Sequence, residues 1–134
     1  IGYTIGNAMS SRPILGENPL YLVQAEVFDR CCAIGPCFVG TECIGSVDDL
    51  TVRCKIDRDG SEIWEGESST SLMPRSCEDL VDWVQRHNPL PDMAVVLLTG
   101  TRVVCPSEFT LREGDVVLIT IDGIGVLEND VLVV

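Results

Sequence analysis

The chain has 134 residues, 46% of them hydrophobic, and its 21 acidic residues against nine basic ones leave a net charge of −12. This charge would repel a phosphate backbone rather than neutralise it, so we expect no nucleic-acid partner. No apolar run approaches the ~18 residues that a membrane-spanning helix needs, so we expect no membrane partner either. At this length we expect a single domain over residues 1–134.

The first segment with functional character is TIGNAMSSRPI, residues 4–14, in which a strand-like entry leads to an expected turn at Gly6-Asn7. Serine hydroxyls and the guanidinium of Arg12 follow within a few residues. Together with an amide, such groups can hold an anionic or carbonyl ligand. The residue directly after the expected turn is Ala8, whose methyl group can do no chemistry.

The clearest local pattern lies between residues 50 and 64. Apolar and polar side chains alternate from Leu50 to Asp57, and Asp59-Gly60 then precedes the apolar Ile63-Trp64. Period-two alternation beside an Asp-Gly pair predicts a β-hairpin with a tight turn.

Glu65 and Glu67 follow this hairpin at positions i and i+2. On a strand they share a face, so the two carboxylates could chelate a hard cation such as Mg²⁺. A solvated strand end is the alternative interpretation, and we favour it because the hairpin leads straight into the pair.

One helix is predicted near residues 77–87. Ser76 with Asp79 three residues later resembles a capping box, and Asn88-Pro89 provides a stop. We interpret the lone histidine, His87, as a helix cap or a surface residue, because an imidazolium interacts favourably with a helix C-terminus. The apolar residues that share one face of this helix are Leu80, Val81 and Val84.

The remaining segments are short, apolar and separated by turn residues. They predict β structure at residues 94–98, 116–121 and 126–134, with a turn at Thr99-Gly100-Thr101. A glycine turn of this kind exposes backbone N–H groups and hydroxyls toward a carboxylate. The predicted class is therefore mostly β, a mixed α+β fold with little helix.

Seven cysteines lie at positions 31, 32, 37, 43, 54, 77 and 105. Their number is odd and no CxxC pair occurs, so neither zinc nor a disulfide framework is indicated. We expect reduced, mostly buried thiols in a cytoplasmic protein, with a reactive Cys31-Cys32 pair as the alternative. The chain begins at Ile1 inside an expected strand and without a signal-peptide pattern, and we expect upstream sequence to be missing.

Nucleophile motifs give no further indication of function. No GxSxG elbow or glycine-rich phosphate loop is present, and the lone histidine lies far in sequence from any nucleophile. A hydrolytic triad is therefore not expected.

Four stretches taken together resemble the C-terminal half of the catalytic domain of the fumarylacetoacetate hydrolase family. They are GYTIGNAMSSRPILGENPLYLVQAEVFDRCCAIGPCFV, EGESSTSLMPRSCEDLVDWV, VVLLTGT and FTLREGDVVLITIDGIGVLEN. The GENPLYLVQAEVF segment is most similar to the branch that includes 2-keto-3-deoxy sugar-acid dehydratases. The resemblance implies a partial β-roll domain, usually dimeric, that binds Mg²⁺ and acts on 2-oxo acids by C–C hydrolysis, dehydration or decarboxylation.

Carried over residue by residue, the resemblance places a metal-ligating aspartate at the position now held by Ala8 and an active-site lysine at Glu26. Arg12 matches the family arginine, and Thr101, with Gly100 beside it, matches a substrate-contacting threonine. The family's own Glu-x-Glu metal pair lies upstream, so Glu65 and Glu67 are not that pair. We therefore expect no metal ligand and no catalytic residue in this chain, with Arg12, Gly100 and Thr101 as the substrate-binding candidates.

Three hypotheses follow from these residues. The chain is a truncated or degenerate, catalytically inactive relative, or it is part of a Mg-dependent enzyme whose N-terminal half is missing here. In the third hypothesis Arg12 and Thr101 hold a small carboxylate without metal. We favour the first, and we expect a homodimer or larger assembly to cover the unpaired strand edges.

Overall fold

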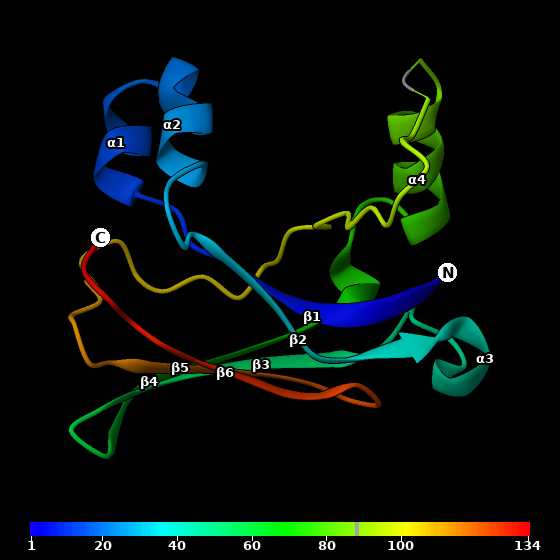
Figure 1. The fold of residues 1–134 in the computed structure, drawn as a ribbon. Coiled ribbons are helices and arrows are strands. Elements are labelled where there is room, and N and C mark those ends of the chain that lie inside the picture. The colour runs from blue at the N-terminus through cyan, green and yellow to red at the C-terminus, as the bar shows by residue number, and fades with distance from the viewer. Residues whose placement is uncertain (88) are drawn as a thin grey trace.

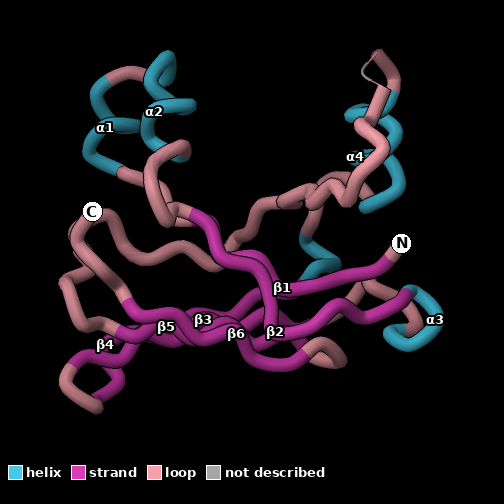
Figure 2. Tube along the Cα trace, in the orientation of Figure 1, coloured by secondary structure: helices cyan, strands magenta, loops and turns pink. Residues whose placement is uncertain are grey.

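The computed structural model describes residues 1–87 and 89–134. Two antiparallel sheets lie against each other, and helical segments project on one side of them (Figure 1). The same view coloured by secondary structure shows that strands make up most of the regular structure (Figure 2). This is the predicted class, mostly sheet with few helices. In chain order the elements are β1 (Gly2–Ala8), α1 (Arg12–Glu17), η1 (Pro19–Tyr21), α2 (Leu22–Glu26), β2 (Cys32–Gly40), α3 (Thr41–Ile44), β3 (Thr51–Arg58), β4 (Ser61–Ser69), η2 (Thr70–Leu72), α4 (Cys77–Gln85), β5 (Val116–Ile121) and β6 (Gly125–Asp130).

The predicted hairpin is confirmed as β3 and β4. Asp59 and Gly60 join the strands with φ angles of 52° and 74°, the left-handed conformation that a tight Asp-Gly hairpin turn requires. The strands pair from Thr51 with Ser69 to Arg58 with Ser61. Local sequence was sufficient here because both strands and their turn are contiguous in the chain.

The four-stranded sheet has the order β4-β3-β5-β6 and is antiparallel throughout. Strand β5 has the predicted bounds, whereas β6 ends at Asp130 and residues 131–134 lie outside it. The prediction of a strand from 126 to 134 was therefore too long. Ile56 of β3, 2% exposed, is paired with Val117 of β5, 5% exposed, which places part of the core at the centre of this sheet.

The two-stranded sheet of β1 and β2 corrects the expected turn at Gly6-Asn7. Both residues lie inside β1, where Gly6 pairs with Ile34 and Asn7 with Ala33. Asn7 is 8% exposed, and its Nδ2 donates a hydrogen bond of 3.0 Å to Oδ1 of Asn129 in β6. A partner outside the local sequence thus satisfies the amide that would otherwise favour a turn.

Apolar side chains join the two sheets. Ile5 of β1 is fully buried, and it packs with Ile124 and Leu127 from the β5–β6 hairpin. The partly buried residues around this cluster are Tyr3, Val39, Ile44, Ile119 and Ile121. The core therefore sits between the sheets and beneath the end of β1.

Helix α4 confirms the predicted helix, with an end at Gln85 rather than at residue 87. The Ser76 hydroxyl accepts a hydrogen bond of 3.1 Å from the Asp79 backbone N–H, which is the expected N-cap. His87 lies exposed beyond the helix, as a surface residue. The predicted stop at Asn88-Pro89 falls partly outside the described residues. Helices α1 and α2, which were not predicted, form a second projection opposite α4 (Figure 1).

The strand predicted at residues 94–98 is absent. This stretch has no regular secondary structure, and all five of its residues are exposed. An extended apolar stretch becomes a strand only when a neighbouring edge accepts its backbone hydrogen bonds. Within residues 1–87 and 89–134, neither sheet includes it as a strand.

Two expectations from composition have different outcomes. In the described part of the chain no helix is long and apolar enough to cross a bilayer. The cysteines were expected to be mostly buried, but none is: Cys32, Cys37 and Cys43 are exposed and the other four are partly exposed. The reason is that several lie on strand faces and helix ends that the small core does not cover.

Candidate functional site

Ala8 and Glu26 flank the α1–α2 projection, one before α1 and the other at the end of α2. Ala8 is the last residue of β1, and the next residue donates its backbone N–H to the Cys31 carbonyl at 2.7 Å. Ser11 donates its backbone N–H to the carbonyl of the fully buried Ala25 at 2.8 Å, and Glu26 follows directly. These backbone bonds close the base of the projection, and the side chains of Ala8 and Glu26 are both exposed.

Arg12 stands at the start of α1 and reaches a segment 93 to 97 positions further along the chain. Its Nη1 donates to the Cys105 carbonyl at 2.8 Å, and its Nη2 donates to the carbonyls of Pro106 at 2.6 Å and Phe109 at 2.9 Å. A longer contact of 3.4 Å joins Nη2 to the Ser107 carbonyl. The guanidinium is therefore occupied by backbone oxygens.

Gly100 and Thr101 come shortly after Leu98, which contacts Gly6 of β1. A Cβ atom at Gly6 would lie 2.6 Å from Leu98 Cδ2, so the glycine there permits the close approach of the later segment. Gly100 has a φ of 78°, as a glycine turn requires, and Thr101 Oγ1 accepts a hydrogen bond of 3.0 Å from the Val103 N–H. This hydroxyl thus organises its own loop.

Glu65 and Glu67 lie within β4 rather than at a strand end, which corrects our interpretation. Glu67 Oε2 accepts a hydrogen bond of 2.6 Å from Nε of Arg53 on β3. This hydrogen bond and the neighbouring charge raise the pKa of Arg53 above its ordinary value. Arg53 also approaches Asp122 at 3.5 Å. The two glutamates therefore do not form an open pair of ligands.

Among the residues that the structure describes, no group of three or more His, Cys, Asp or Glu side chains is placed to share a metal ion. The chemistry of the donors agrees with this geometry. Glu26 ends α2 with a carboxylate, whereas Ala8 at the end of β1 offers only a methyl group. A Mg²⁺ site needs several oxygen ligands in near-octahedral arrangement. The residues present do not fit the ion, and we derive no metal-dependent step for this chain.

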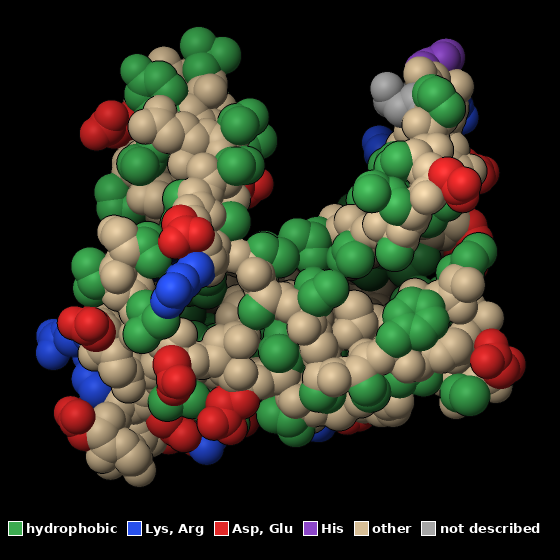
Figure 3. Space-filling view, viewed as in Figure 1, with side chains coloured by type: hydrophobic (Ala, Val, Ile, Leu, Met, Phe, Trp, Pro, Cys, Tyr) green, Lys and Arg blue, Asp and Glu red, His purple; other side chains and the backbone are tan. Residues whose placement is uncertain are grey.

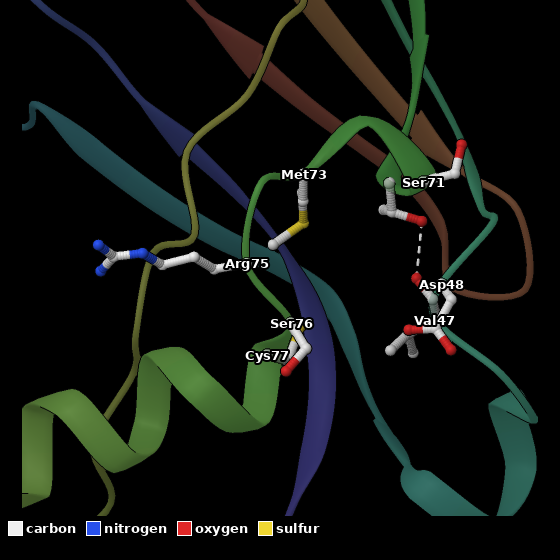
Figure 4. Close-up of a pocket in the computed structure, with 8 residues that line it drawn as sticks. Val47, Asp48, Ser71, Met73, Arg75, Ser76 and Cys77 are labelled. Atoms are coloured by element: carbon white, nitrogen blue, oxygen red, sulfur yellow. Dashed lines mark hydrogen bonds between the residues drawn. The ribbon is translucent and has the colours of Figure 1, made fainter.

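The surface formed by the described residues includes two hollows of note. One, of about 170 Å³, lies between η2, the N-terminus of α4 and the loop before β3, and is lined by polar and apolar side chains in similar measure (Figure 4). The other, of about 460 Å³, is bordered by Met9, Phe28, Cys31, Leu111 and Val134 among others. None of the five candidate positions, namely Ala8, Arg12, Glu26, Gly100 and Thr101, lines either hollow.

A buried ion pair was missed by sequence reasoning. Asp115, 1% exposed, accepts hydrogen bonds of 2.7 Å on each carboxylate oxygen from Nε and Nη2 of Arg58. It also accepts the Arg112 backbone N–H at 2.8 Å. The hydrogen bond from Arg58 is the main cause that holds the pKa of Asp115 below its ordinary value. The available signal was an acid just before an apolar strand, together with an arginine at the end of the first strand of the predicted hairpin.

Three cysteine thiols have a raised pKa, which makes them less reactive at neutral pH. Burial raises the pKa of Cys54 to about 11, with a smaller contribution from Cys105. Burial also raises the pKa of Cys77 and Cys105. Because the thiolate is the reactive form, these three cysteines stay protonated near neutral pH.

Comparison with known proteins identifies the family. Residues 1–132 match the family described as Fumarylacetoacetate (FAA) hydrolase C-terminal. The chain belongs to this family. The resemblance seen in the sequence is thereby confirmed, and so is the partial β-roll fold.

Two relatives belong to the branch that the sequence indicated. The chain is 52% identical, over all of its length, to a protein of Haloferax volcanii named probable 2-keto-3-deoxyxylonate dehydratase. It is 39% identical over 95% of its length to the 2-dehydro-3-deoxy-D-arabinonate dehydratase of Saccharolobus solfataricus. It covers 46% and 42% of these two proteins, so the chain spans about half the length of the curated relatives it matches.

A solved structure gives the same fold. The 2-keto-3-deoxy-D-arabinonate dehydratase complexed with magnesium and 2,5-dioxopentanoate superposes with a TM-score of 0.92 at 39% identity. The match covers 96% of this chain and 46% of that chain. Magnesium and a small 2-oxo acid are thus found in a structural relative.

Proposed function

We propose that this chain by itself is a catalytically inactive half of a fumarylacetoacetate hydrolase fold. The observation that carries the proposal is the presence of Ala8 and Glu26, before α1 and at the end of α2, at the positions that the resemblance assigns to a metal ligand and a lysine. A methyl group cannot replace a carboxylate ligand. A carboxylate at Glu26 brings negative charge where an ammonium would help an enolate-like charge to develop.

A second candidate is a Mg-dependent enzyme of 2-oxo acids, acting by dehydration, C–C hydrolysis or decarboxylation, in which this chain is joined to another half. The lengths of the relatives favour it, since the chain covers less than half of each dehydratase. In that protein the further ligands would come from sequence outside the chain described here. The substrate class would be the 2-keto-3-deoxy sugar acids named for those relatives.

The third candidate is metal-free binding of a small carboxylate by Arg12, Gly100 and Thr101. The contacts of Arg12 argue against it, because Nη1 and Nη2 donate to four backbone carbonyls. A carboxylate that bound to these two atoms would have to displace those bonds. Stabilisation of the chain by pyruvate or oxalate without metal would favour this candidate.

We also propose that the chain assembles as a homodimer or larger oligomer in a reducing cytoplasm. Large apolar side chains are exposed on both projections and on the segment between them, and Figure 3 shows them around the hollowed face. Exposed apolar surface on this scale is typical of an interface. The exposed apolar residues include Leu20, Val23, Val27, Trp83, Val96 and Leu98.

Light scattering at tens of micromolar tests the assembly, and a monomer would contradict it.

The proposed inactivity is tested by supplying 2-keto-3-deoxy sugar acids with Mg²⁺ and measuring loss of substrate. We expect no turnover above the uncatalysed rate. Turnover that disappears in Thr101→Ala would show that a working site exists.

Thermal melting tests the metal directly. A site with a dissociation constant near 0.1 mM would stabilise the fold by about 2.7 kcal/mol at ~10 mM Mg²⁺. We expect instead a shift of less than about 2 °C relative to Na⁺ at matched ionic strength. Ala8→Asp should not restore the shift, because one carboxylate with waters makes a poor Mg²⁺ site. A rise of about 5 °C or more in the unaltered chain would overturn the proposal.

A further inference from the structure

The guanidinium of Arg12 lies among a set of carbonyls that belong to one short stretch of chain. Four carbonyls between Cys105 and Phe109 accept its Nη1 and Nη2 donors. The Pro106 carbonyl also accepts the Phe109 backbone N–H at 3.0 Å, so this loop is closed on itself at the same point. A planar group with several donors in a fixed arrangement suits such a ring of carbonyls better than a single ammonium would.

The same stretch is docked on the four-stranded sheet from its other side. The Phe109 ring lies 6.4 Å from the Trp64 ring of β4, centroid to centroid. A Cβ atom at Gly66 would lie 3.1 Å from Val103 Cγ1, so the segment passes close over β4. The loop is therefore attached in two independent ways. Apolar contacts join it to β4, and hydrogen bonds join it to Arg12 at the start of α1.

Gly100 and Thr101 lie between two contacts that this segment makes with strands. Leu98 contacts β1 at Gly6, and Val103 contacts β4 at Gly66. No regular secondary structure spans residues 89–115, so contacts of its side chains and loops fix the segment. Toward its C-terminal end these include the Arg12 bonds to residues 105–109 and the bond of 3.2 Å from Arg58 Nη2 to the Thr110 carbonyl.

We propose that Arg12 is a positioning residue, a clasp that holds residues 105–109 against β4 and thereby fixes the end of the segment that carries Gly100 and Thr101. Its Nη1 and Nη2 donate to backbone carbonyls of this loop, so holding the loop is the role that its contacts show. The assignment stands on contacts within the chain and does not depend on whether the chain has activity.

The test uses two reporters, one on the loop of residues 105–109 and one on β4 beneath it. In a Trp83→Phe background the remaining Trp64 reports its contact with Phe109 by fluorescence, and hydrogen exchange at the Phe109 amide reports the loop bond. In Arg12→Ala we expect the Phe109 amide to exchange at least about tenfold faster. We also expect Trp64 emission to shift to longer wavelength as the ring is uncovered. Arg12→Lys should give exchange and emission between those of the parent and those of Arg12→Ala, because one ammonium reaches fewer carbonyls than a guanidinium.

Arg30→Ala is the matched control, since that arginine is 67% exposed and its ion pair is a 3.9 Å contact with its neighbour Asp29. It should leave both reporters unchanged. Should Arg12→Ala fail to fold, Arg12→Lys carries the test. Unchanged exchange and emission in the Arg12 variants would overturn the proposal. So would about 10 mM oxalate stabilising the parent but not Arg12→Ala while Phe109 exchange stays equal in both.

Discussion

Two apolar stretches of similar sequence have different structures. Residues 94–98, AVVLL, lie exposed without regular structure, whereas β5, VVLITI over Val116–Ile121, is a central strand. Strand β5 pairs with β3 on one edge and with β6 on the other. The difference shows that a neighbouring strand determines whether such a stretch becomes a strand. High β propensity favours a place in a sheet, but a free edge must be present to accept its backbone hydrogen bonds.

The largest expected effect comes from the carboxylate that anchors β5 to β3. Asp115→Asn keeps the size of the side chain but removes the charge that Arg58 contacts through two hydrogen bonds of 2.7 Å. We expect the free energy of unfolding to fall by about 3 to 4 kcal/mol, because a partly buried arginine is left without its counter-ion. Urea unfolding measures the change.

Asp122→Asn is the matched control, because this aspartate is 53% exposed and 3.5 Å from its arginine. We expect a change within about 0.5 kcal/mol for it. Equal effects of the two substitutions would mean that the buried pair does not anchor β5.

A pair of truncations compares the two stretches directly. Ile56→Ala removes a side chain that is 2% exposed and paired with β5, and it should destabilise the fold by about 2 to 3 kcal/mol. Leu97→Ala removes one that is 39% exposed in the unpaired stretch, and it should change stability by less than about 1 kcal/mol. Both are measured by denaturant unfolding at a concentration that light scattering shows to be free of association. A larger loss for Leu97→Ala would show that residues 94–98 are packed after all.

The smallest expected effect is the pH dependence of the anchor. Arg58 holds the pKa of Asp115 below its ordinary value of 3.8 in the folded chain. A lowered folded pKa contributes stability above the unfolded pKa, and that contribution is lost as the pH falls through the folded value. The difference in unfolding free energy between the parent and Asp115→Asn should therefore be constant above about pH 5 and shrink below about pH 4. A difference that stays constant down to about pH 2 would contradict the assigned cause.

Local patterns predicted the parts of the fold whose partners are near in sequence. The hairpin around Asp59-Gly60 and the helix capped by Ser76 are contiguous, so alternation, turn residues and the cap were enough. Asn7 was assigned to a turn because its partner, Asn129, is 122 positions away and no local pattern reveals it. Residues 94–98 have the composition of a strand, but composition does not show whether an edge is available.

The residues of the candidate site likewise fall into those that the sequence identified and those whose contacts it could not predict. Ala8 and Glu26 could be identified by resemblance, and the structure puts them before α1 and at the end of α2. The contacts of Arg12 could not be predicted, because its acceptors are backbone carbonyls that have no side-chain signature. The Asp115 pair was equally hidden, since its arginine is 57 positions earlier.

The pairing of β3 with β5 also has a consequence for synthesis on the ribosome. The hairpin of β3 and β4 is complete roughly 45 residues before β5 begins. At the usual pace of translation, the edge of β3 waits about 2 to 10 seconds for its partner. During that interval Ile56, which is buried in the finished fold, has no β5 to cover it. The nascent chain therefore exposes a paired but half-covered sheet edge, the kind of surface that chaperones bind.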